Sequence, residues 1–406
     1  VYFLQQPPDS IRAKRIWEIC DEQGMRVGVY GSLCSWPPRK VDGFYVPDTF
    51  APTAETYPAK AAAIQELNLT YTRSIRLPSD KDGLMFKARL GARLLGLGLG
   101  PATVARIARQ LARERVSPEV RWQRVALQPL VNFDFFSRLY RKHRPEFATF
   151  HTNHVAHYMH TYWKAMQPDA FEEDATPDEV RVYGRAIEHG YRTADELLKR
   201  MLKLIDENTV LVIASSMGQK PFVSSVKGGK QVRQIRSLEK IIEILGVEGR
   251  AEALSTMSDQ FNIYPDSTAT RDFITSALKA AYVDTPDQPM FWVSTVENSI
   301  TVNLLPYNTI TEESRCHFPN LDKDSSMLYE NLVYSTGMVK SGCHDPKGMM
   351  IMYGPGVRRG GFIPECNNLD IAPTLLSILG LGVPVEMSGR VLEEALTEAP
   401  QAALAY

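Results

Sequence analysis

The sequence lacks the features that mark membrane-spanning and strongly charged proteins. It contains no run of eighteen apolar residues, the length that a transmembrane helix needs, and no secretory signal segment is visible. The formal net charge is −1, so no surplus charge favours nucleic acid or a membrane surface as a partner. We therefore expect a cytoplasmic protein without stable membrane insertion and without a nucleic-acid partner.

Cysteine is scarce and follows no recognisable spacing. Five cysteines are spread over 406 residues, and none forms a Cys-x-x-Cys pair: Cys20, Cys34, Cys316, Cys343 and Cys366. An odd and scattered set argues against a disulfide framework and favours a reducing compartment. Internal repeats and low-complexity tracts are also missing, which argues against a repeat architecture.

What is present is the composition of an ordinary globular protein, with 44% hydrophobic and 23% charged residues. Residues 11–24 read as a helix that ends at a glycine, and residues 27–33 follow as a buried strand. The same strand pattern returns at residues 147–151, 210–214 and 349–353. This alternation predicts an α/β fold with a mostly parallel central sheet flanked by helices.

We predict a single domain of this kind over residues 1–406, with two insertions. Residues 101–116 form a basic amphipathic helix inside a segment, 81–128, whose composition differs from its surroundings. Such a helix either binds an acidic partner or a membrane surface, or it exposes its charges to water. Exposure to water is the commoner case, so we expect a helical cap insertion at residues 81–128. Residues 230–310 mix short helices with a hairpin expected near 291–305, which predicts an α+β insertion.

The densest chemical signal is residues 147–163, which read F-A-T-F-H-T-N-H-V-A-H-Y-M-H-T-Y-W. Four of the eight histidines occur here at every third residue: His151, His154, His157 and His160. On an α-helix, steps of three residues advance about 300° each, so two or three of these rings, and not all four, face one ligand. The alternative for several of them is a local capping or packing role.

A second polar group follows the strand predicted at residues 210–214. It contains Ser215, Ser216 and Gln219, and we expect it to meet Thr152 and Asn153 at the carboxyl edge of the sheet. Ser215 or Ser216 is a candidate nucleophile with a nearby histidine as its base. The alternative is that the serine pair serves only the turn, which is its commoner use.

These segments occur in an order that resembles the alkaline phosphatase superfamily. A helix, a strand and W-P-P come first, then the histidine-rich helix, then a strand and S-S-M-G-Q. The closing block contains G-C-H-D-P-K-G-M-M-I-M-Y-G-P-G-V and N-N-L-D-I-A-P-T-L-L-S-I-L-G-L-G-V-P-V-E-M-S-G-R-V-L. This block carries most of the resemblance, and it is most similar to the type I phosphodiesterase/nucleotide pyrophosphatase branch.

The resemblance implies two metal ions that clamp a phosphoryl group while a threonine or serine attacks it. Transferred onto this chain, His344 matches the last histidine ligand of the family, and either His157 or His160 matches the middle one. Asn153 stands where the family has an aspartate ligand. The segment that carries the family's nucleophile is not evident in the sequence.

The departures from the family change the expected metal site. Ser216 and Met217 stand where the family has an Asp-His pair, so a carboxylate and an imidazole are lost. We therefore do not expect the usual two-metal centre. Either no metal or one zinc-like divalent metal is expected, with His157, His160 and His344 as candidate ligands. A metal-free pocket in which histidines act as acid or base is equally open.

We expect a remodelled enzyme that hydrolyses or transfers a small-molecule phosphate ester, phosphate diester or related ester. Its candidate catalytic residues are His154, His157, His160, Asn153, Ser215 and Ser216. The alternative is a non-catalytic superfamily member that binds a ligand or scaffolds an assembly, for which the lost metal ligands argue. The sequence leaves the oligomeric state open.

Overall fold

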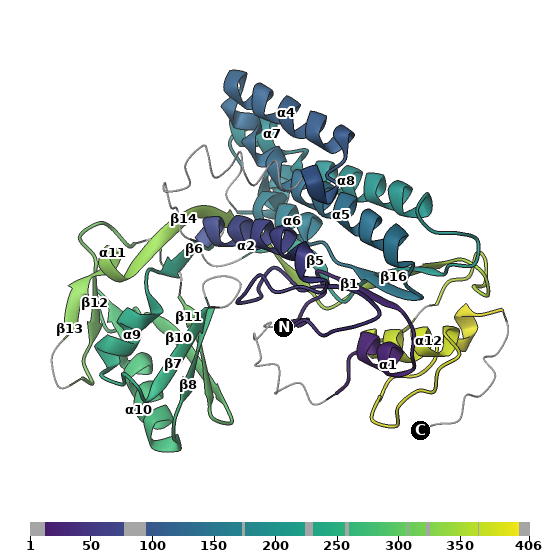
Figure 1. Ribbon diagram of the computed structural model, residues 1–406. Coiled ribbons are helices and arrows are strands. Elements are labelled where there is room, and N and C mark those ends of the chain that lie inside the picture. The colour runs from purple at the N-terminus through teal and green to yellow at the C-terminus, as the bar shows by residue number, and fades with distance from the viewer. Residues whose placement is uncertain are drawn as a thin grey trace.

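The computed structural model of the protein describes residues 13–76, 95–172, 175–223, 230–255, 260–305, 307, 309–321, 325–363 and 365–397. The fold is mixed α/β, with helices packed around several small sheets. Figure 1 shows a large lobe, which contains the first and last α-helices of the described chain, α1 (Ile16–Glu22) and α12 (Ile371–Ile378), and a small lobe built from residues 238–333.

The large lobe contains most of the helices. They are α1 (Ile16–Glu22), α2 (Ala62–Arg76), α4 (Pro101–Val116), α5 (Leu127–His143), α6 (His154–Met166), α7 (Pro177–Tyr183), α8 (Ala186–Leu202) and α12 (Ile371–Ile378). Its strands are β1 (Val27–Tyr30), β2 (Gly43–Val46), β3 (Phe147–Phe150), β4 (Leu211–Ser215), β5 (Gly218–Pro221), β15 (Gly342–Asp345) and β16 (Met349–Tyr353). Short 3₁₀ turns occur at Ala59–Ala61, Pro118–Ala126, Pro168–Ala170, Asn368–Asp370 and Glu393–Ala395.

The four strands predicted from the sequence form, but the strand pairs of the described residues do not show them in the predicted single, mostly parallel sheet. β1 pairs in parallel with β2 and β3, whereas β4 pairs with β16, in antiparallel orientation, and with no other described strand, and β5 pairs with β15. Most strand pairs in the described part of the chain are antiparallel. An apolar run identifies a buried strand but contains no information on its direction or partner, which explains the difference.

An aromatic core fixes β1 and β3 against α5. The rings of Phe133, Phe136 and Phe150 lie with centroids 5.1–5.9 Å apart, and Tyr30 lies 5.7 Å from Phe150. Burying each of these rings contributes roughly 1.5–3 kcal/mol. The carboxyl ends of β1 and β3 are thereby held at a fixed place on the surface of this core.

Helix α8 packs against α6 and carries part of the wall of the site. The sequence pattern suggests one helix over residues 177–208, but the structure breaks it into α7 and α8 at Gly184. A Cβ at Gly184 would lie 2.6 Å from the carbonyl oxygen of Val180 and 3.2 Å from that of Ala165 at the end of α6. Glycine therefore permits α6 to pass close to this break.

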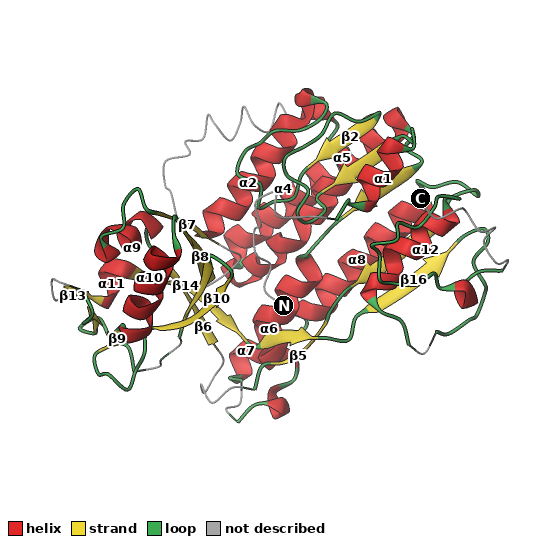
Figure 2. Cartoon of the chain, turned by 90° about the horizontal axis from the view of Figure 1, so that it is seen from below, coloured by secondary structure: helices red, strands yellow, loops and turns green. Residues whose placement is uncertain are grey.

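The small lobe has its own apolar core, which extends from Ile241 to Val333. It consists of α9 (Leu238–Leu245), β7 (Ala251–Ser255), β8 (Gln260–Pro265), α10 (Thr268–Ala280), β9 (Tyr282–Val283), β10 (Phe291–Val296), β11 (Ser299–Leu304), β12 (Arg315–Phe318), β13 (Ser325–Leu328) and α11 (Tyr329–Leu332). The hairpin expected near residues 291–305 is confirmed as β10 and β11. Figure 2 shows α9 and α10 on one side of the sheet of order β10-β11-β8-β7.

A two-stranded ribbon of β6 (Lys230–Ile235) and β14 (Val333–Lys340) joins the lobes (Figure 1). The basic helix expected at residues 101–116 is confirmed as α4, while residues 81–94 of the predicted cap lie outside the described residues. Within the described ranges, no helix is both long enough and apolar enough to cross a membrane. All five cysteines are free thiols.

Candidate active site

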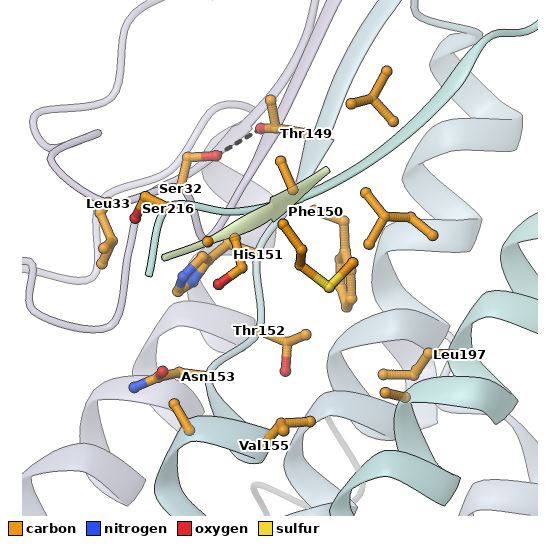
Figure 3. Close-up of a pocket in the computed structure, with 18 of the residues that line it drawn as sticks. Ser32, Leu33, Thr149, Phe150, His151, Thr152, Asn153, Val155, Leu197 and Ser216 are labelled. Carbon is orange, nitrogen blue, oxygen red and sulfur yellow. Dashed lines mark hydrogen bonds between the residues drawn. The ribbon is translucent and has the colours of Figure 1, made fainter. Parts of the chain in front are cut away.

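A cavity of about 2750 Å³ opens where strands of the large lobe end. The segments that follow β1, β3 and β4 lead into it through Ser32, His151 and Ser216. Figure 3 shows these three residues around one end of the space, with Thr152 and Asn153 further along it. Of the seven residues predicted as catalytic residues or metal ligands, six line the cavity: Asn153, His157, His160, Ser215, Ser216 and His344.

The turn between β3 and α6 presents Asn153 to this cavity. Asn153 is the N-cap of α6, and its carbonyl oxygen accepts a hydrogen bond from the amide of His157 at 3.0 Å. Its side chain makes no capping hydrogen bond, although asparagine favours that role. The amide group is therefore available to a ligand in the cavity.

His154 does not line the cavity; its ring forms a hydrogen bond that links α6 to α8. Its Nε2 donates to the carbonyl oxygen of Gly190 at 3.1 Å, and its Nδ1 accepts from the Thr152 hydroxyl at 2.8 Å. The ring is buried, and this burial lowers the pKa of His154 to about 4. With both nitrogens occupied, His154 has the structural role that the sequence left open as an alternative.

His160 is held in one tautomer by the backbone of β15. Its Nδ1 lies 2.8 Å from the carbonyl oxygen of Gly342, and a carbonyl only accepts, so Nδ1 carries the proton. Its Nε2 lies 3.2 Å from Nε2 of Gln219, which donates to it and also lies 3.4 Å from the carbonyl oxygen of Ala156. Burial lowers the pKa of His160 to about 4 despite the Gly342 bond, so the ring is neutral at pH 7.

His344 lies beside His160, on β15. The two ring centroids are 4.7 Å apart and the rings are almost perpendicular, at 89°. His344 is opposite Gln219 in the register of β15 with β5, so three side chains from three elements form one cluster. The ring nitrogens of His344 make no hydrogen bond to any described residue, and partial burial lowers the pKa of His344.

His151 and His157 line the same cavity as His160 and His344. Burial lowers the pKa of both. The His151 side chain is partly exposed to water, yet protein atoms surround it on most sides. This surrounding protein disfavours the charged ring and lowers the pKa of His151. The lowered pKa values of His151, His157, His160 and His344 all favour the neutral ring at physiological pH.

The two serines at the end of β4 differ in their surroundings. The Ser215 hydroxyl donates to the carbonyl oxygen of Met217 at 2.7 Å, which is the turn role considered for this pair. The Ser216 hydroxyl makes no hydrogen bond to the described residues, and Ser216 lines the cavity. Of the two candidates, only Ser216 has a hydroxyl that is available.

The sequence did not assign a role to Gln219, although it orients His160. No local signal could have indicated this role, because β5 reads G-Q-K-P and its partner β15 lies more than a hundred residues away. Lys340 and Lys347 also line the cavity. Lys340 contributes to the lowered pKa of both His160 and His344, which indicates a positive potential at the site.

The two-metal centre of the resembled family does not fit these residues. Ser216, Met217 and Asn153 replace two carboxylates and an imidazole, and both nitrogens of His160 are hydrogen-bonded. Coordination through Nε2 of His160 would displace Gln219. Across the part of the chain that the structure describes, no three His, Cys, Asp or Glu side chains are grouped so as to hold a metal ion.

Comparison of the sequence with models of protein families and with curated proteins finds no match to either.

Proposed function

We propose that the protein is an enzyme of the alkaline phosphatase superfamily, with a remodelled site that hydrolyses or transfers a phosphate ester or a related ester. The observation that carries the proposal is the cluster of His160, His344 and Gln219 beside the ends of β3 and β4. A neutral, oriented imidazole next to a cavity that holds a serine hydroxyl is the arrangement that ester cleavage by a general base requires.

In the proposed reaction His344 is the general base, because its ring nitrogens are available whereas those of His160 are occupied. Ser216 or a water molecule loses its proton to His344 and attacks the phosphorus or other ester centre. The protonated His344 then returns the proton to the leaving oxygen. Where Ser216 has attacked, a water molecule or acceptor alcohol then gives its proton to His344 and displaces the Ser216 oxygen, which takes the proton back. His160 and Gln219 are positioning residues, since they fix the wall against which His344 packs.

The charge of the cavity supports an anionic substrate. Five basic residues line it against three acidic ones: Arg26, Arg141, Arg144, Lys340 and Lys347 against Glu146, Asp195 and Asp206. Lysine ammonium groups bind phosphate as point charges. The amide of Asn153 adds an uncharged donor to the lining of the cavity.

We also infer that the β2-β1-β3 and β4-β16 sheets are two parts of one layer, as the superfamily resemblance requires. The carboxyl ends of β1, β3 and β4 lead into the same cavity, which supports a common strand direction for these three. One zinc-like ion bound through His157 and His344 is the alternative cofactor proposal, and elemental analysis of the purified protein tests it.

The test is an ester panel: p-nitrophenyl phosphate, bis(p-nitrophenyl) phosphate and p-nitrophenyl sulfate, assayed with the whole chain. The His344→Ala variant should lose about 10²- to 10⁴-fold in kcat, the usual contribution of a general base. The control is His317→Ala, because His317 stacks on Tyr282 in the small lobe at a centroid distance of 4.8 Å. Phosphate binding without turnover would instead support the non-catalytic, ligand-binding alternative.

A further inference from the structure

The sheet of the small lobe has two faces of different chemistry. Alternate residues of β8, β10 and β11 point into the apolar core beneath α9 and α10, among them Phe261, Val293 and Val302. The residues between them point to the opposite face. No outward position of these three strands holds a charged residue; on this face the edge strand β7 contributes Glu252.

One row of this outer face crosses three strands. Trp292 on β10 is paired with Asn303 on β11, and Asn303 is paired with Gln260 on β8. Neighbouring strands lie about 4.8 Å apart, so the row is about 10 Å wide, which suits one or two small rings. All three residues line the same cavity as the histidine cluster.

The row combines a stacking surface with an unsatisfied donor. The Trp292 side chain is 45% exposed. The Asn303 Nδ2 atom is buried but has no hydrogen-bond acceptor, and in the next row the Oδ1 of Asn262, a residue only 1% exposed, has no donor. Buried amide groups that lack partners destabilise a fold, so their retention beside an exposed indole points to a ligand that supplies the partners.

We propose that Trp292, Asn303 and Gln260 bind a neutral ring that carries hydrogen-bonding groups, as a sugar or a nucleobase does. The ring stacks on the Trp292 indole, and one of its oxygen or nitrogen acceptors receives the Asn303 Nδ2–H. A charged ring is disfavoured because the row itself, Trp292, Asn303 and Gln260, holds no charged residue; the nearest charge placed on this face by the strand register is Glu252 on the edge strand β7, opposite Tyr264. The site is independent of the ester chemistry proposed above, although it opens into the same cavity.

The experiment titrates ¹⁵N-labelled full-length protein with methyl α-D-glucopyranoside, with adenosine and with inorganic phosphate, following the side-chain amide signals by NMR. We expect saturable shifts of the Asn303 side-chain signals with one or both neutral probes and none with phosphate. Trp292→Ala should weaken binding at least about 10-fold, the scale of a lost stacking contact. Asn303→Ala should weaken it about 2- to 10-fold, the scale of one hydrogen bond.

Two further variants separate binding from folding. Asn303→Leu removes the unsatisfied donor, so it should abolish binding while raising the unfolding temperature by about 2 °C or more. Phe273→Ala is the matched control, because Phe273 is 43% exposed on α10, on the other side of the same sheet. It should bind the probes as the unmodified protein does.

The outcomes are distinct. Binding of the glucoside alone identifies a sugar site, binding of adenosine alone identifies a nucleobase site, and both support the proposal. No saturable shift with either probe at about 50 mM, or equal affinity in the Trp292→Ala and Asn303→Ala variants, would overturn it. Because His344→Ala leaves this face intact, loss of ester cleavage in that variant with unchanged probe binding tells the two proposals apart.

Discussion

Replacing Gln219 with glutamate tests the contact on which the proposed site depends. In the structure the Gln219 amide nitrogen lies 3.2 Å from Nε2 of His160 and donates to it, which requires that nitrogen to be unprotonated. A glutamate oxygen at the same place would repel the lone pair on Nε2 of neutral His160. It would accept a hydrogen bond from Nε2–H of protonated His160. The Gln219→Glu substitution should therefore raise the pKa of His160.

The size of this rise follows from the distance. Opposite charges about 4 Å apart attract by about 4 kcal/mol at an effective dielectric constant of 20, and the burial of the new carboxylate offsets part of that. One pKa unit corresponds to about 1.4 kcal/mol, so a rise of about two units is expected. The pKa of His160, which burial lowers to about 4, should then be near 6.

The assay is an NMR titration of the histidine ring nitrogens between about pH 3.5 and pH 8, with the His160 signal assigned by its loss in His160→Asn. Gln167→Glu is the matched control, because Gln167 is exposed and follows the last turn of α6, so screening should hold its effect below about 0.3 unit. A His160 pKa that stays within about half a unit of its original value in the Gln219→Glu variant would refute the contact.

Two further predictions concern stability. His154 and His160 have folded-state pKa values of about 4 against about 6.5 when unfolded, so the unfolded chain binds more protons between these pH values. The free energy of unfolding should therefore fall as the pH falls through that window, by up to about 3 kcal/mol for each ring. Urea titrations at pH 7 and pH 4.5 measure this change. An equal free energy of unfolding at both pH values would contradict the burial of these rings. Gly342→Ala places a Cβ 2.2 Å from the carbonyl oxygen of Met159, so it should destabilise the protein by more than about 2 kcal/mol, measured in the same way. Gly96→Ala, where nothing lies within 4 Å of the added Cβ, serves as the control, and an equal effect of both substitutions would count against the close packing of β15 on α6.

Elements with strong local signals could be predicted from the sequence almost to the residue. β16 is a run of five apolar residues ended by Gly354, and α4 begins with Pro101 in its first turn. The pairing of strands could not be predicted in the same way. β5 is short and contains Lys220 and Pro221, and its partner is fixed by the packing of α6 rather than by any nearby residue.

The candidate site was only partly predictable for a related reason. The spacing of the histidines limited how many could face one ligand, but the rotation of α6 about its axis decides which ones do. That rotation is set by contacts with α8, where Tyr158 packs on Gly190 and turns His154 away from the cavity. The role of Gln219 follows from a strand pairing that no local pattern contains.

The open edge of β3 has a consequence for how the cavity responds to mutation. The amides of Phe147 and His151 donate to β1, through the carbonyl oxygens of Arg26 and Tyr30. Because a strand alternates, the peptide groups of Ala148 and Phe150 point the other way, away from β1, and no described strand pairs with them; both residues line the cavity. The floor of the cavity is thus polar even where its side chains are apolar. Alanine scanning leaves these main-chain groups in place, so any contact that a ligand makes with them would be invisible to side-chain substitution.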